Sequence, residues 1–138
     1  METFQVHILA ADRIFYEGPC VSLTIPASDG ERSILAHHDS MIAAIQPGTL
    51  RWQAPEQGVQ LAAVSPGMVK VERNDVLVLV DSAERPEEID EARARREADE
   101  AREAILQKKS RQEHQLAQSA LARALNRLRV SAHGGVIH

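Results

Sequence analysis

Few side chains in this sequence are spaced as a reactive site would require. His37, His38 and Asp39 are consecutive, but neighbours on a strand point to opposite faces and no third ligand is signalled, so we predict no metal site there. Cys20 is the only cysteine and lies in the alternating run CVSLTI at residues 20 to 25. That position is typical of a small strand residue rather than of a nucleophile.

The sequence also lacks the motifs that signal common enzyme classes. It contains no phosphate-cradling glycine loop, no zinc-ligand spacing and no nucleophile elbow, so we predict that the protein is not an independent enzyme. A net charge of −4 does not favour nucleic-acid binding. One cysteine excludes an internal disulfide and suits a reducing compartment. Residues 1 to 11 do not resemble a signal peptide, and no apolar run approaches the ~20 residues of a membrane span, so we expect a cytosolic protein or one bound to a membrane only through partners.

A change of composition near Pro86 divides the chain. All six prolines, all four aromatic residues and five of the seven glycines lie in residues 1 to 86, whereas residues 87 to 133 contain no glycine or proline. The second part is rich in Ala, Arg, Glu, Gln and Leu, which are strong helix formers. We predict one domain over residues 1 to 85 and a helical domain over residues 86 to 138.

The first part has the pattern of many short strands. Apolar and polar residues alternate in runs of five or six residues, and turn signals such as Ser28-Asp29-Gly30 and Gln46-Pro47-Gly48 recur about every 8 to 12 residues. This rhythm predicts an antiparallel β-sandwich of about ten short strands, with no room for parallel βαβ crossovers. The apolar run from Val76 to Val80 predicts a strand covered on both faces, by the opposite sheet and by the helical domain.

The second part predicts two helices. Acidic residues follow Pro86, as expected at a helix start, and a first helix should run from residue 87 to about 106. Two apolar stripes are spaced so that helices could pack along their length, the first at Ala94, Ala98, Ala101 and Ile105 and the second at Ala117, Leu121, Ala124 and Leu128. The polar residues 107 to 114 suit the turn of an antiparallel hairpin, but without glycine or proline they could equally stay helical.

The two helical halves differ in charge. Residues 87 to 103 hold eight acids and four arginines, while residues 104 to 133 hold six basic residues and Glu113 alone. Packed antiparallel, the halves attract, and the alanine seam buries little apolar area, so the hairpin should be able to open and expose a basic helix to an acidic partner. The alternative is that these charges are ordinary solvated helix faces.

Several motifs resemble the ε-subunit family of bacterial F-type ATP synthases, in order and spacing, over essentially the whole chain. They are Asp29-Gly30-Glu31, Ile34-Leu35-Ala36-His37-His38, Gln46-Pro47-Gly48, Val64-Ser65-Pro66-Gly67-Met68-Val69-Lys70-Val71, Asp81-Ser82-Ala83-Glu84 and Ile89-Asp90-Glu91-Ala92-Arg93-Ala94. Ser33, Ala36 and Pro66 depart from the residues usual in the family.

The resemblance implies a non-catalytic subunit of the central stalk, peripheral to the cytoplasmic face of the bacterial plasma membrane. Its sandwich would bind the γ subunit and contact the c-ring, coupling their rotation to catalysis in a proton-translocating synthase. Its mobile helices would inhibit ATP hydrolysis. A free-standing helical adaptor without a rotary ATPase is the alternative, although a coiled coil would need larger apolar residues than these alanines.

Site residues also follow from the resemblance. Glu31 and His38 would lie in the loop that faces the c-ring, where a plain packing role in the loop is the alternative for the histidine. The basic second helix, with Arg123, Arg127 and Arg129, would contact acidic surfaces of the α/β catalytic head.

Some family members bind ATP through an Ile-Asp-x-x-Arg-Ala motif on the first helix and arginines on the second. The matching residues here are Ile89, Asp90, Arg93, Ala94, Arg123 and Arg127. Two guanidinium groups could converge on phosphates and Ala94 could leave space for a base. Asp90 and Arg93 could instead form a plain i, i+3 ion pair, and Glu100 stands where nucleotide-binding relatives can carry arginine. We expect no required cofactor and, as an additional prediction, regulatory ATP with magnesium.

Overall fold

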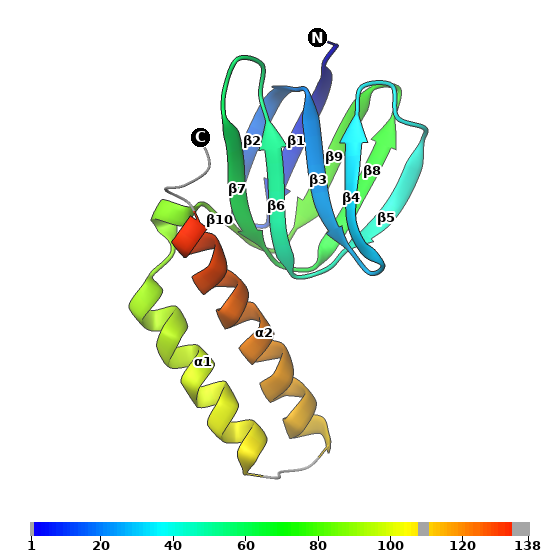
Figure 1. Ribbon diagram of the computed structural model, residues 1–138. Coiled ribbons are helices and arrows are strands. Elements are labelled where there is room, and N and C mark those ends of the chain that lie inside the picture. The colour runs from blue at the N-terminus through cyan, green and yellow to red at the C-terminus, as the bar shows by residue number, and fades with distance from the viewer. Residues whose placement is uncertain (1, 108–110, 134–138) are drawn as a thin grey trace.

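The structure is a computed structural model that describes residues 2–107 and 111–133, with the backbone alone for Arg111 and His133. Within these residues, ten strands form a β-sandwich and two helices follow it, as predicted (Figure 1). The strands are β1 (Phe4–Ala10), β2 (Arg13–Cys20), β3 (Ser22–Ala27), β4 (Gly30–Leu35), β5 (Met41–Ile45), β6 (Gly48–Gln53), β7 (Val59–Val64), β8 (Gly67–Glu72), β9 (Asp75–Val80) and β10 (Ala83–Glu84). The short 3₁₀ helix η1 (Pro86–Glu88) leads to α1 (Glu91–Leu106) and α2 (Arg111–His133).

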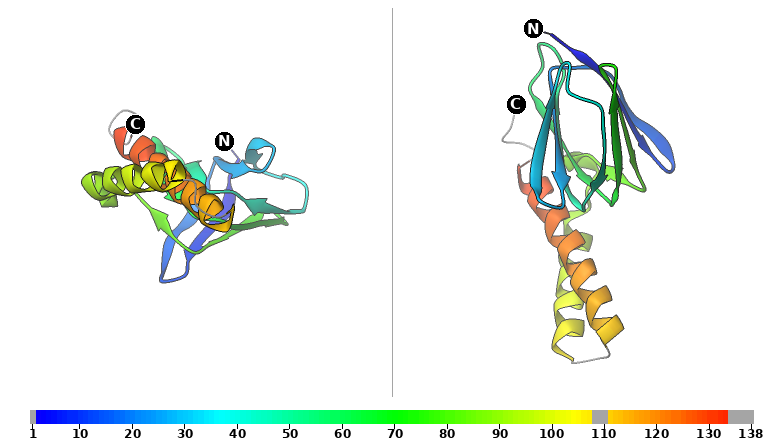
Figure 2. Two further views of the ribbon diagram at one scale, coloured as in Figure 1. Left: turned by 90° about the horizontal axis from the view of Figure 1, so that it is seen from below. Right: turned by 90° about the vertical axis from the view of Figure 1, so that its right-hand side faces the viewer.

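The strands form two five-stranded sheets that face each other (Figure 2). Sheet A has the order β2-β1-β9-β8-β5, and sheet B has the order β10-β7-β6-β3-β4. All pairs are antiparallel except β1 with β9, which run parallel with Val6 opposite Val76. Alternation along a strand shows which side chains face the core but not which strand lies alongside, so this parallel pair could not be predicted from the pattern.

The core lies between the sheets and follows the predicted alternation. Val6 and Ile8 of β1 are completely buried, and Trp52 of β6 is 1% exposed. The prediction that the run from Val76 to Val80 is covered on both faces is wrong, because Leu79 is 37% exposed on the outer face of sheet A. α2 packs against β6 and β7 of sheet B, so the hairpin leaves that outer face uncovered.

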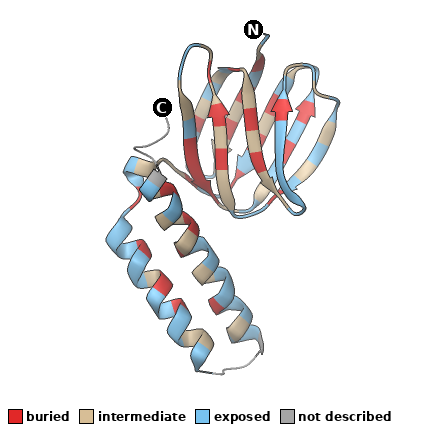
Figure 3. Cartoon of the chain, in the orientation of Figure 1, coloured by how far each residue is buried: buried red, intermediate tan, exposed pale blue. Residues whose placement is uncertain are grey.

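The two helices form an antiparallel hairpin, which was one of the two predictions for the polar residues 107 to 114. Residues 108–110 of that segment lie outside the described residues. α1 leads away from the sandwich and α2 returns, so that the C-terminal half of α2 meets sheet B (Figures 1 and 2). Buried residues lie along both helices (Figure 3), and five of them belong to the predicted stripes: Ala94, Ala98, Ala101, Ala117 and Ala124. Across residues 2–107 and 111–133, neither helix is both long and apolar enough to cross a membrane.

Candidate functional site

The junction between α2 and sheet B joins the two parts of the chain. Val130 of α2 is 1% exposed and packs with Leu61 and Ala63 of β7 and with Ile89 of the linker. These four side chains form an apolar cluster separate from the sandwich core. The cluster is small, so the polar contacts around it decide how firmly the helix docks.

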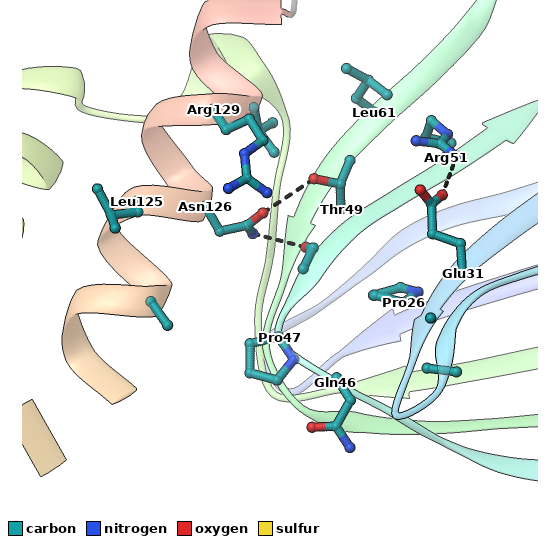
Figure 4. A pocket seen from close by; sticks show the side chains of 15 residues that line it. Pro26, Glu31, Gln46, Pro47, Thr49, Arg51, Leu61, Leu125, Asn126 and Arg129 are labelled. Carbon is teal, nitrogen blue, oxygen red and sulfur yellow. Dashed lines mark hydrogen bonds and ion pairs between the residues drawn. The ribbon is translucent and has the colours of Figure 1, made fainter. Parts of the chain in front are cut away.

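Asn126 supplies the most specific of these polar contacts. Its side chain is 8% exposed, its Nδ2 donates to the Gly48 carbonyl at 2.9 Å, and its Oδ1 accepts from the Thr49 hydroxyl at 3.2 Å (Figure 4). Both ends of the amide are therefore satisfied by β6. Because a buried amide without partners is costly, these two bonds favour one register of α2 on the sheet.

A cleft of about 690 Å³ lies beside Asn126, between α2 and the β3–β4 turn (Figure 4). Arg129 of α2 lines one wall, and the ion pair of Arg51 with Glu31 lines the sheet side. Its remaining lining is largely apolar, from residues that include Pro26 and Leu125. The cleft therefore exists only while the helix is docked.

Arg127 lies on α2 next to Asn126 and contacts two carboxylates. Its Nη2 donates to Oε2 of Glu84 at 3.0 Å, and its Nη1 donates to Oε2 of Glu97 at 3.1 Å. Its Nε lies 2.8 Å from Oε1 of Glu84 as a charge contact, although that N–H is not aimed at the oxygen. Glu84 belongs to β10 and Glu97 to α1, so one guanidinium joins the sandwich to both helices.

The linker before α1 is tied to the sandwich. Arg13 of β2 donates to Glu88 at 2.8 and 3.1 Å, and these bonds from Arg13 are the main cause that holds the pKa of Glu88 below its ordinary value. Arg85 lies over the rings of Phe15 and Trp52 and donates to the Phe15 carbonyl at 3.1 Å. Sequence reasoning missed this anchoring, because nothing local connects residues about 70 positions apart.

The predicted nucleotide residues on α1 have structural partners. Asp90 caps α1 by accepting from the Arg93 backbone N–H at 3.0 Å, and the Arg93 guanidinium pairs with Glu97. The expected i, i+3 ion pair between Asp90 and Arg93 is therefore replaced by a helix cap. Ile89 belongs to the apolar cluster at the junction, and Ala94 is completely buried against α2.

The predicted arginines on α2 lie one turn apart but have different surroundings. Arg123 is exposed and lines a groove of about 440 Å³ between the helices, which also contains Glu97 and Glu100. Arg127 is only 19% exposed and already holds two carboxylates. A polyphosphate would have to displace Glu84 and Glu97 from Arg127, so the docked hairpin does not present a vacant phosphate site. Nucleotide binding stays a prediction.

Glu31 and His38 do not share a loop, which corrects the expectation that they do. Glu31 lies within β4 opposite Pro26, at the end of the sandwich nearer the hairpin, whereas His38 follows β4 at the far end (Figure 1). The motif that joins Glu31 and His38 forms a strand rather than a turn. A six-residue strand spans roughly 20 Å, so the two residues lie far apart. A contact of either residue with a c-ring stays a prediction.

The two adjacent histidines engage different partners. His37 Nε2 lies 3.3 Å from Glu2, whereas His38 Nδ1 lies 2.7 Å from the Asp39 carbonyl. Among the described residues, no three His, Cys, Asp or Glu side chains gather as metal ligands would.

An uncovered row of apolar side chains crosses the outer face of sheet A. The strand registers place one residue from each of the five strands side by side: Ala44, Met68, Leu79, Leu9 and Ile14. We call these five residues the apolar row. Ile14 is 65% exposed, and Met68 and Leu79 are each more than a third exposed. An aligned set of this kind on a sheet face is typical of a protein interface.

Comparisons with known proteins cover nearly the whole chain. Residues 3–86 match the family model "ATP synthase, Delta/Epsilon chain, beta-sandwich domain", and residues 87–132 match "ATP synthase, Delta/Epsilon chain, long alpha-helix domain". The ATP synthase epsilon chain of Caldanaerobacter subterraneus is 39% identical over 95% of each chain. That of Ruminiclostridium cellulolyticum is 38% identical over 93% of this chain and 95% of its own. The fold is also similar to a chain in the cryo-EM structure of the Euglena gracilis mitochondrial ATP synthase, with a TM-score of 0.84 and 22% identity over 95% of this chain and 82% of that one.

Proposed function

The chain belongs to the ATP synthase delta/epsilon family, whose bacterial epsilon chains are non-catalytic subunits of the F-type central stalk, and we propose that it anchors by its sandwich and regulates by its hairpin. The sandwich binds γ and contacts the c-ring of a proton-translocating synthase. The hairpin restrains ATP hydrolysis by the α/β head. The protein is then peripheral to the cytoplasmic face of the bacterial plasma membrane and reaches it only through the complex. Agreement over nearly the full chain leaves the free-standing adaptor without support.

One observation supports the assignment of attachment to the sandwich and of regulation to the hairpin: the apolar row and the docked helix lie on opposite sheets. The apolar row faces outward from sheet A, while α2 packs on β6 and β7 of sheet B. The helix can therefore leave the sandwich without disturbing an interface on the other face. A subunit that must stay attached while one part moves requires this separation.

The apolar row is the surface we assign to γ. Changing Met68 and Leu79 together to Asp places two charges at its centre while leaving the inward-facing core unchanged, so the fold should persist and binding to γ should fall at least tenfold. The matched control changes Ser33 and Gln60 to Asp on sheet B. Retention of γ by the first variant at the level of the control would exclude this surface.

Regulation is assigned to the basic face of α2. Changing Arg123, Arg127 and Arg129 to Glu should raise ATP hydrolysis by the reconstituted complex without releasing the subunit, and added salt should partly reproduce this for the unmodified protein. The control reverses Arg95, Arg96 and Arg102 on α1, which changes the net charge equally. An equal rise in both variants would show that total charge, and not α2, is responsible.

Contact with the c-ring is assigned to Glu31 or to His38. Because β4 separates the two, we expect Glu31→Lys and His38→Glu to affect association with the ring unequally. Bound ATP with magnesium is proposed as a regulator rather than as a required cofactor.

A further inference from the structure

Among the described side chains, Arg127 is distinguished by holding the sandwich, α1 and α2 together. It contacts Glu84 through two nitrogens, Nε at 2.8 Å and Nη2 at 3.0 Å, and Glu97 through Nη1 at 3.1 Å. The side chains of Arg127 and Glu84 are 19% and 29% exposed. Partial burial weakens screening by solvent, so this ion pair is stronger than one at an open surface.

The rest of the junction is modest by comparison. The apolar cluster contributes four side chains, of which two are from β7 and one each from the linker and α2. Asn126 adds two neutral hydrogen bonds. Neutral bonds contribute less than charge-assisted ones, so the charged contact of Arg127 with Glu84 accounts for a large share of the docking.

The linker shows where the hairpin can pivot. The segment up to Glu88 stays with the sandwich, since β10 pairs with β7 and Glu88 is held by Arg13. Ile89 and Asp90 come next, both extended, with φ/ψ of −80/124° and −79/97°. In the described part of the chain, no strand pairing with the sandwich continues past η1. Rotation at Ile89 and Asp90 moves both helices and leaves the sandwich intact.

We propose that the ion pair of Glu84 with Arg127 is a latch that holds the hairpin on the sandwich, and that opening the latch releases the hairpin to swing about Ile89 and Asp90. This rests on the regulatory role assigned above to α2. While the latch is closed, two carboxylates neutralise Arg127. When it opens, Arg127 keeps Glu97, which moves with the hairpin, but loses Glu84, so Nε and Nη2 become free to bind an acidic surface elsewhere. Docking and inhibition are then alternatives that share one arginine.

Glu84→Gln tests the latch sharply, because it removes the carboxylate and keeps the positive charge on α2. Glu87→Gln is the matched control, since Glu87 is exposed and belongs to the same linker. Spin labels at Ser33 and Gln118, both exposed, report the separation of sheet B and α2, and the native Cys20 is buried and would not be labelled. Electron-spin distance measurements on the full chain should show on the order of tenfold more of the long-distance population for Glu84→Gln than for Glu87→Gln.

Two further variants separate a latch from a general loss of stability. Glu97→Gln should release the hairpin less than Glu84→Gln, because Glu97 lies on α1 and moves with the hairpin. Arg127→Lys should release it partly, since an ammonium keeps the charge but loses the fork that two carboxylates share. Distance distributions for Glu84→Gln and Arg127→Lys that match the unmodified chain would overturn the proposal.

ATP hydrolysis by the reconstituted complex gives a separate readout. Glu84→Gln should inhibit more strongly than the unmodified subunit, while Glu87→Gln should not. If the distances lengthen and hydrolysis is unchanged, the latch stands and the regulatory role of α2 fails. If the distances do not change, the latch fails whatever hydrolysis does.

Discussion

The Arg127 guanidinium on α2 donates to the Glu84 carboxylate on β10, with Nη2 3.0 Å from Oε2, although the two residues are 43 positions apart in the sequence. Glu84 lies in the last strand and Arg127 in the last helix. This contact is therefore present only while the hairpin is docked on the sandwich. It also explains why a residue expected to bind phosphate is already engaged by carboxylates in this conformation.

Fragments of the chain test where the sandwich ends. A fragment ending at Glu84 should fold alone and bind γ, as the composition predicts. One ending at Glu88 should melt a few degrees higher, because Arg85 then stacks on Phe15 and Trp52, a contribution of about 1 kcal/mol. Thermal melts of both fragments check this. An unfolded 1–84 fragment would contradict the domain boundary, and equal midpoints would show that Arg85 contributes nothing.

Asn126→Leu should weaken the docking of α2. The substitution keeps a side chain of similar size but leaves the Gly48 carbonyl and the Thr49 hydroxyl without their partner, at a cost of about 1 to 3 kcal/mol. Amide resonances of Gly48 and Thr49 should then move toward those of the 1–88 fragment, which has no α2. Thr49→Val removes one bond only and should shift the Gly48 resonance less. Unmoved resonances in Asn126→Leu would mean that the apolar cluster alone holds the helix.

The fold could be predicted from the sequence where the pattern within one strand or helix is enough to identify its buried face. Alternation placed Val6 and Ile8 on the buried face, and the alanine stripes placed the helix seam correctly. The prediction failed where the packing partner of a strand lies far along the chain, because the exposure of Leu79 depends on which sheet the hairpin packs against. Asp90 had a local signal, an acid just before a helix, that indicated a cap more directly than a ligand.

The junction was harder to predict than the fold. Asn126 differs visibly from the Ala, Leu and Arg around it, which could have marked it as a contact residue. Its partners on β6 lie 77 and 78 residues away, and no periodicity connects them. The ion pairs of Arg127 were hidden for the same reason, because helical spacing reveals only neighbours three or four residues apart.

Alkaline pH should destabilise the sandwich through two neighbouring groups. Burial raises the pKa of the Cys20 thiol from 9.0 to about 11, and burial is also the main cause that raises the pKa of Tyr16 from 10.0 to about 12. The unfolded chain therefore loses these protons first, so the free energy of unfolding is unaffected below pH 9 and falls as the pH rises toward 11 and 12.

Urea midpoints between pH 8 and 11 measure this effect. In Cys20→Ala only Tyr16 remains, so the decline should begin nearer pH 10. Parallel curves for the two proteins would show that the thiol is not linked to folding.

Magnesium and ATP should raise the thermal midpoint of the isolated subunit if the hairpin binds nucleotide, because a ligand stabilises the state that it binds. Arg93→Ala and Arg123→Ala should abolish the increase, while Arg102→Ala, on the same helix as Arg93, should retain it. Calorimetry that detects no heat at millimolar ATP would exclude the nucleotide site and leave family membership untouched.

The rate of ATP hydrolysis by the reconstituted complex, with the intact subunit or with a chain ending at Glu88, tests the regulatory role of the hairpin most directly. The shortened chain keeps the sandwich, the apolar row and the anchored linker, and lacks both helices. We predict that both chains remain bound to the complex and that hydrolysis is several-fold faster with the shortened one. Equal hydrolysis rates with equal binding would contradict it.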